Sequence, residues 1–139
     1  MKSAFVPMIV AGLCFAGPLD AQTVSLGEFE YRNSCAVCHG EDGTGNGPFA
    51  GMMEIGPVDL TVLQRNNGGV FPVERLYKAI DGSEDVKAHG MRDMPVWGTR
   101  YIARIDNDPA FDYSPDERRR YARNRILALI EYLSTIQAE

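Results

Sequence analysis

The chain has 139 residues, of which 45% are hydrophobic and 24% charged, and its formal net charge at pH 7 is −5. This length fits one domain with a single hydrophobic core. Because an acidic chain has no electrostatic attraction for phosphate backbones, nucleic acid is not expected as a partner, whereas a basic patch on another protein would attract it.

The N-terminus has the features of a secretory signal. Lys2 precedes the apolar run 4–16, and the small residue Ala21 suits a cleavage site. The apolar run is short for a bilayer span. We therefore predict a signal peptide over 1–21 and an exported domain over 22–139, located in the periplasm, with no transmembrane segment in the mature chain. An uncleaved N-terminal anchor is the alternative.

A first helix is predicted from Gln22 onwards, with bulky residues near one stripe at helical spacing, namely Leu26, Phe29, Tyr31 and the pair Cys35 and Cys38. Gly27 is unusual in this helix. Glycine in a helix interior costs about 1 kcal/mol relative to alanine. We therefore expect another backbone to approach closely at Gly27, although a position in the helix start would also explain it.

Cys35 and Cys38 are separated by two residues, and His39 follows directly. This C-x-x-C-H pattern is typical of covalent c-type haem attachment, with the thiols on one helical turn and the imidazole as iron ligand. A redox dithiol requires a thioredoxin-like strand context that this sequence lacks, and a zinc site requires a second ligand pair. Cys14 lies in the predicted signal. We therefore predict one haem c, attached through Cys35 and Cys38, with His39 as the proximal ligand.

The stretch 40–48 contains four glycines and is predicted to be a loop. It lacks the lysine and the preceding strand of a phosphate-binding loop. A loop that wraps over the flat edge of a haem explains these glycines better.

Two helices are predicted in the second half of the chain. Pro72 opens a short one over 72–80. Ser114, Pro115 and Glu117 supply the N-cap, the first-turn proline and the capping-box acid of the last one. The expected core-facing residues are Val73, Leu76, Tyr77 and Ile80 in the first, and Ala122, Ile126, Leu129, Ile130, Leu133 and Ile136 in the second.

Charged residues dominate two further stretches. Residues 99–113 show no clean period and are predicted to form an inserted surface loop, with partner docking as the alternative. The arginines at positions 118–120, 123 and 125 are interpreted as a solvated helix face.

The segment 87–98 offers several candidates for a second axial ligand. Pro95 keeps the residue before it extended, which helps Met94 to present its thioether, and Val96 and Trp97 would shield the iron from water. The other candidates are His89 and Met91 in this segment and Met52 and Met53 in the preceding loop.

The C-x-x-C-H motif, the glycine-rich loop and the stretch MPVWG at 94–98 together resemble a class I c-type cytochrome over about residues 25–137. The resemblance implies an all-α fold in which the N- and C-terminal helices cross around one covalent haem, with Met94 as sixth ligand. It places Tyr132 over Gly27 at that crossing.

The resemblance also implies a proline carbonyl that accepts a hydrogen bond from the proximal imidazole. The stretch 56–61 supplies Pro57 for this role, with Pro48 as the runner-up and an ordinary turn proline as the plain alternative.

On this resemblance we expect an electron carrier and not an enzyme, because the sequence offers no nucleophile, catalytic dyad or substrate pocket. Electrons would pass from a dehydrogenase or bc-type donor to an oxidase or another acceptor. The alternatives are a haem-based sensor or ligand-binding protein with a displaceable sixth ligand, and a cytochrome subunit of a larger dehydrogenase complex.

Overall fold

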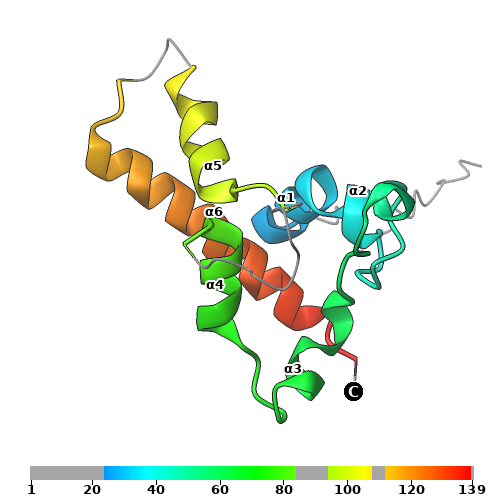
Figure 1. Ribbon diagram of the computed structural model, residues 1–139. Coiled ribbons are helices and arrows are strands. Elements are labelled where there is room, and N and C mark those ends of the chain that lie inside the picture. The colour runs from blue at the N-terminus through cyan, green and yellow to red at the C-terminus, as the bar shows by residue number, and fades with distance from the viewer. Residues whose placement is uncertain (1–23, 84–93, 108–111, 139) are drawn as a thin grey trace, which may run out of the picture.

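The computed structural model describes residues 24–83, 94–107 and 112–138 (Figure 1). These residues form helices and loops without a strand, which confirms the predicted all-α class. The predicted signal over 1–21 and the candidates His89 and Met91 lie outside the described residues. The helices are α1 (Leu26–Ser34), α2 (Ala36–His39), η1 (Ala50–Met52), η2 (Leu60–Val62), α3 (Leu63–Asn66), α4 (Val73–Asp81), α5 (Trp97–Asp106) and α6 (Pro115–Thr135).

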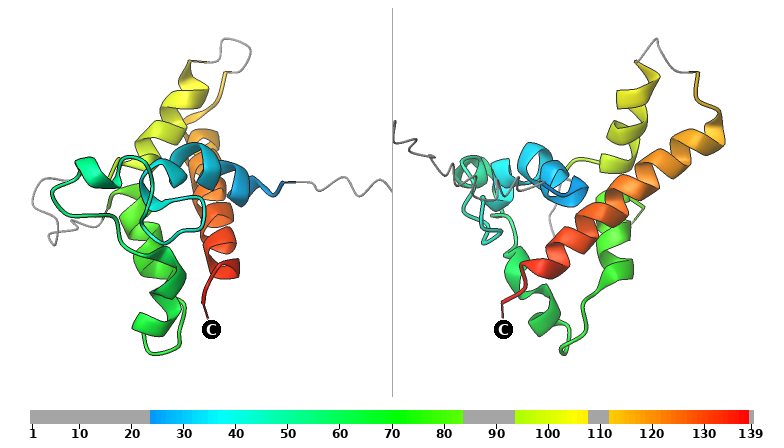
Figure 2. Two further views of the ribbon diagram at one scale, coloured as in Figure 1. Left: turned by 90° about the vertical axis from the view of Figure 1, so that its right-hand side faces the viewer. Right: turned by 180° about the vertical axis from the view of Figure 1, so that it is seen from behind.

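Helix α6 is the element on which α1, α4 and α5 pack (Figures 1 and 2). It begins with the predicted capping box, in which the Ser114 hydroxyl accepts from the Glu117 amide and the Glu117 carboxylate accepts from the Ser114 amide. Its apolar stripe is also confirmed. The buried residues are Ala122, Ile126, Leu129, Ile130 and Leu133, and Ile136 packs against them half-buried.

Helix α1 lies across the C-terminal half of α6 (Figure 2). The contacts of Gly27 with Ala128 and Tyr132 mark the crossing point. A Cβ placed on Gly27 would lie 2.0 Å from the carbonyl oxygen of Ala128 and 2.8 Å from the Cβ of Tyr132. The Tyr132 ring packs on Tyr31, with ring centroids 5.2 Å apart. The close approach predicted at Gly27, with Tyr132 beside it, is therefore confirmed.

The buried face of α1 differs from the predicted stripe. Leu26 and Phe29 are exposed, so the prediction is wrong for both, while Tyr31 is buried as expected. The buried residues are Gly27, Glu30, Tyr31 and Ser34. They follow ideal helical spacing, but three of them are not apolar, so a search for apolar residues selects the wrong face.

Helix α4 confirms the predicted short helix and ends at Gly82, whose φ of 88° lies in the left-handed region. Leu76 and Ile80 are buried and Tyr77 packs half-buried against the core. Val73 is 49% exposed, so its predicted place in the core is wrong. It is the first residue of the helix, three positions before the buried Leu76.

Helix α5 corrects the prediction of a surface loop over 99–113, which is wrong for residues 99–106. Trp97, Tyr101 and Ile105 are buried at a spacing of four residues, which is one face of a helix. Charged residues lie between them in the sequence and hide this period. No helix of the described residues is both long enough and apolar enough to cross a membrane.

Candidate functional site

One helical turn carries the predicted attachment residues. The Cys35 amide donates to the Tyr31 carbonyl at 2.8 Å, which continues α1, and the His39 amide donates to the Cys35 carbonyl at 2.9 Å. Both thiols, of Cys35 and Cys38, are free. The two sulfurs and the imidazole therefore leave the backbone from a single turn, as the motif predicts.

The glycine-rich loop folds back on this turn and braces its backbone. The amides of Gly45, Gly47 and Phe49 donate to the carbonyl oxygens of His39, Cys38 and Val37 at 2.8, 3.0 and 3.0 Å. A Cβ on Gly47 would lie 2.5 Å from the Cys38 carbonyl oxygen, and one on Gly45 would lie 2.5 Å from that of Pro57. These two glycines are required because backbone packs directly on backbone.

Tyr31 fixes the end of the same turn. Its buried hydroxyl donates to the Gly40 carbonyl at 2.6 Å, which links α1 to the residue after His39. Burial raises the pKa of Tyr31, with the nearby Cys35 thiol as a second cause, so the hydroxyl stays a donor. The sequence indicated Tyr31 as a core residue but gave no signal of this polar role.

The His39 ring is oriented by a backbone carbonyl. Its Nδ1 lies 3.0 Å from the carbonyl oxygen of Val58, and because a carbonyl only accepts, Nδ1 carries the proton and Nε2 keeps its lone pair. Burial lowers the pKa of His39, while the Val58 bond opposes this effect. A neutral imidazole with a free Nε2 is the form that binds a metal.

The carbonyl that accepts from His39 is one residue away from the predicted one. The prediction named Pro57, and the structure gives this role to Val58, so the assignment to the Pro57 carbonyl is wrong. The Pro57 carbonyl oxygen lies instead beside Gly45. A proline cannot donate but its carbonyl accepts like any other, so residue type alone does not decide between the two neighbours.

Met94 and Trp97 lie at the core, whereas Met52 in the loop does not. Trp97 is buried in the core cluster that also contains Cys35, and Met94 packs against that cluster half-buried. Met52 is 78% exposed. Of the candidate thioethers, Met94 is thus better placed than Met52, and the contact of Trp97 with a cofactor stays a prediction.

Cys35 does not have the electrostatics of a redox dithiol. Burial raises the pKa of its thiol to about 12, and the negative charge of Glu30 adds to the effect. Thiols that attack disulfides work as thiolates and have lowered pKa values. Two free thiols for covalent attachment and an imidazole nitrogen for the iron, all on one turn, are instead the residues that a covalently attached haem needs.

A buried ion cluster that the sequence did not reveal lies beside this site. The Glu30 carboxylate in α1 is 0% exposed, and it accepts from the Nη1 of Arg104 in α5 at 3.1 Å and from the Nη1 of Arg125 in α6. Tyr101 adds a buried hydroxyl without a hydrogen-bond partner among the described residues, and Arg125 Nε is likewise unpartnered there. We call Glu30, Tyr101, Arg104 and Arg125 the Glu30 cluster.

The arginine run of α6 is therefore not a uniform solvated face, and that interpretation is wrong for two of its members. Arg125 belongs to the Glu30 cluster, and Arg118 pairs with Asp106 of α5 at 2.7 Å. Arg125 therefore links α6 to α1, and Arg118 links α6 to α5.

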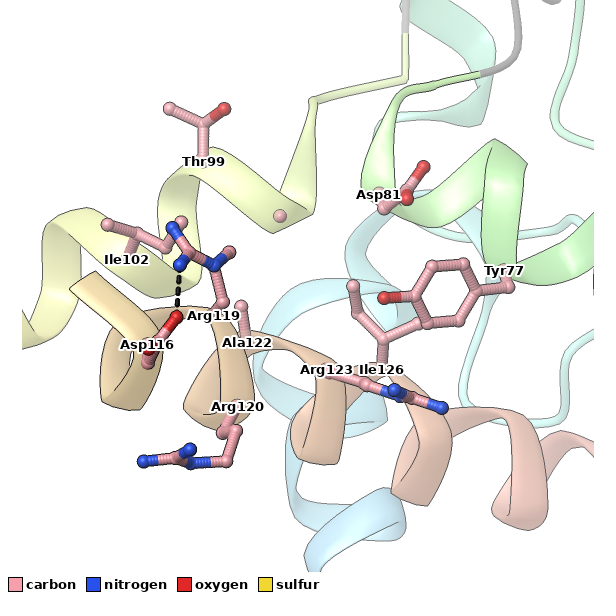
Figure 3. Close-up of a pocket in the computed structure, with 11 residues that line it drawn as sticks. Tyr77, Asp81, Thr99, Ile102, Asp116, Arg119, Arg120, Ala122, Arg123 and Ile126 are labelled. Atoms are coloured by element: carbon pink, nitrogen blue, oxygen red, sulfur yellow. Dashed lines mark hydrogen bonds and ion pairs between the residues drawn. The ribbon is translucent and has the colours of Figure 1, made fainter.

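The other three arginines border a groove of about 560 Å³ between α4, α5 and α6 (Figure 3). Its charged lining consists of Arg119, Arg120, Arg123, Asp81 and Asp116, and Arg119 pairs with Asp116. Three positive and two negative side chains nearly balance, so the groove shows no marked preference for a ligand of either charge.

Comparisons of the chain with models of protein families, with curated proteins and with solved structures each gave no match. The functional assignment accordingly depends on the residues and the geometry described above.

Proposed function

We propose that this protein is a periplasmic electron carrier of the class I cytochrome c type, with one haem c attached at Cys35 and Cys38. The observation that carries the proposal is the single turn on which two free thiols precede His39, whose Nδ1 is held by the Val58 carbonyl. Its partners would be redox proteins, and the chain would perform no bond chemistry on a substrate.

When bound, the haem supplies the Fe(III)/Fe(II) couple, and the chain's own residues determine how that couple is held. The Val58 carbonyl orients His39 and increases its basicity as a ligand. The brace from the glycine-rich loop and the Tyr31–Gly40 bond keep the attachment turn rigid. Met94 would supply a thioether ligand, which would favour the reduced state relative to imidazole and would suit a carrier of high potential.

Covalent attachment is the first point to test. In Cys35→Ala/Cys38→Ala the haem should no longer survive denaturation with the polypeptide, as measured by intact mass and by haem stain on a denaturing gel. Cys14→Ala is the matched control and should keep covalent haem in the exported protein. A haem mass increment that persists in the double variant would refute the proposal.

The sixth ligand separates the electron carrier from a haem sensor with an open coordination site. The ferric protein should show the weak long-wavelength band of sulfur ligation. This band should be lost in Met94→Ala, which should also bind cyanide or carbon monoxide readily, and it should be unchanged in the exposed control Met52→Ala. Wild-type protein that lacks the band and binds these ligands directly would favour the sensor.

A further inference from the structure

The Glu30 cluster places three charges from three helices at one buried point. One carboxylate faces two guanidiniums, so the cluster carries a net charge of about +1. Arg104 and Arg125 are also stacked over aromatic rings, at 5.5 Å from the Tyr101 centroid and 4.5 Å from the Tyr121 centroid. These contacts restrict both side chains and keep their charges in place.

This cluster lies within electrostatic reach of the attachment turn. Glu30 occupies the buried face of α1 one turn before Ser34, and Cys35 follows directly. Burial raises the pKa of the Cys35 thiol, and the Glu30 charge adds to this effect, in agreement with their proximity. Charges buried in protein are poorly screened and act over longer distances than charges on the surface.

We propose that the Glu30 cluster tunes the reduction potential of the haem attached at Cys35, with Glu30 lowering the potential and the two arginines raising it. The inference rests on the proposed function. An oxidised haem carries one more positive charge than a reduced one. A nearby carboxylate therefore stabilises the oxidised state, and a nearby guanidinium stabilises the reduced state.

Burial determines the order of the three contributions. The exposed fraction of the side chain is 0% for Glu30, 21% for Arg125 and 44% for Arg104. Both guanidiniums contact the Glu30 carboxylate, and water screening, which is weakest for the most buried charge, ranks the three groups. The effect on the potential should decrease from Glu30 to Arg125 to Arg104.

The test is a spectroelectrochemical titration of the intact holoproteins at pH 7. Glu30→Gln should raise the reduction potential, Arg125→Gln should lower it, and Arg104→Gln should lower it by a smaller amount. Arg119→Gln is the matched control, because it removes the same charge from α6 at a side chain that is 67% exposed and pairs with Asp116. It should shift the potential least.

Glu30→Gln leaves two guanidiniums, one of them mostly buried, without this counter-charge and is the variant most at risk of not folding. Arg104→Gln, with a half-exposed side chain, keeps the test decisive in that case. If Arg104→Gln and Arg125→Gln move the potential upwards, or no further than Arg119→Gln does, the inference is wrong. Such a result, obtained with haem still covalently attached, would leave the proposed function intact, whereas absence of attached haem from the wild type would refute the function itself.

Discussion

The crossing of α1 and α6 provides the sharpest test of the fold, through the substitution Gly27→Ala. The new Cβ would lie 2.0 Å from the Ala128 carbonyl oxygen, whereas ordinary contact begins at 3.4 Å. Helix α6 would have to move by about 1.4 Å, and a close-packed core does not absorb such a shift.

The expected cost follows from two opposing effects. Overpacking a core costs about 1–3 kcal/mol. The upper end applies here, because two of the atoms that Cβ would meet, the carbonyl carbon and oxygen of Ala128, are backbone and cannot rotate away. Replacing a helical glycine returns about 1 kcal/mol. Gly27→Ala should therefore lower the free energy of unfolding by about 2 kcal/mol or more.

Urea unfolding of the holoprotein, followed by far-UV circular dichroism, measures this loss as a lower midpoint at an unchanged m-value. Gly51→Ala is the matched control, because no atom of the described residues lies within 4 Å of its new Cβ. Gly98→Ala should fall between the two, with its Cβ 3.0 Å from the Asp81 carbonyl oxygen. If Gly27→Ala is as stable as Gly51→Ala, the helices do not cross as closely as the structure shows.

Three further substitutions test local interactions by the same unfolding assay. Ser114→Ala removes the N-cap of α6 and should cost about 1 kcal/mol, so an unchanged midpoint would contradict the capping role. Hydrogen bonds, chiefly from the Thr44 amide, hold the pKa of Asp42 below its usual 3.8, so its stabilisation is present above pH 3.8 and lost as pH falls through the lowered value. The stability difference between wild type and Asp42→Asn should accordingly shrink on acidification, and a difference that grows would reverse the assigned sign. Gln137→Ala breaks a 2.7 Å bond to the Leu60 carbonyl and should cost about 1–2 kcal/mol, whereas no loss would show that water replaces the amide.

Several features of this protein follow from short stretches of sequence alone. The capping box at Ser114 and Glu117 and the apolar stripe of α6 involve contacts within one helix or one repeating pattern, so local physics is sufficient to predict them. The same holds for the helix that ends before Gly82 and for the single turn that carries Cys35 and His39. The close approach at Gly27 was also predictable, because glycine within a helix is costly and needs a reason.

Only the tertiary structure determined which residues are buried, and which carbonyl binds His39, at positions where spacing and residue type indicated different answers. The buried face of α1 includes Glu30, which no apolar pattern marks, because its charge is balanced by arginines more than 70 positions later in the chain. The sequence pattern did not predict α5, because Arg100 and Arg104 separate its buried residues in the sequence. Arg104 reaches this carboxylate, and Arg100 lies over the Trp97 ring. The choice of Val58 over Pro57 depends on how the loop turns in space. In each case the deciding contact joins segments distant in sequence, and its energy does not exist until the chain has folded.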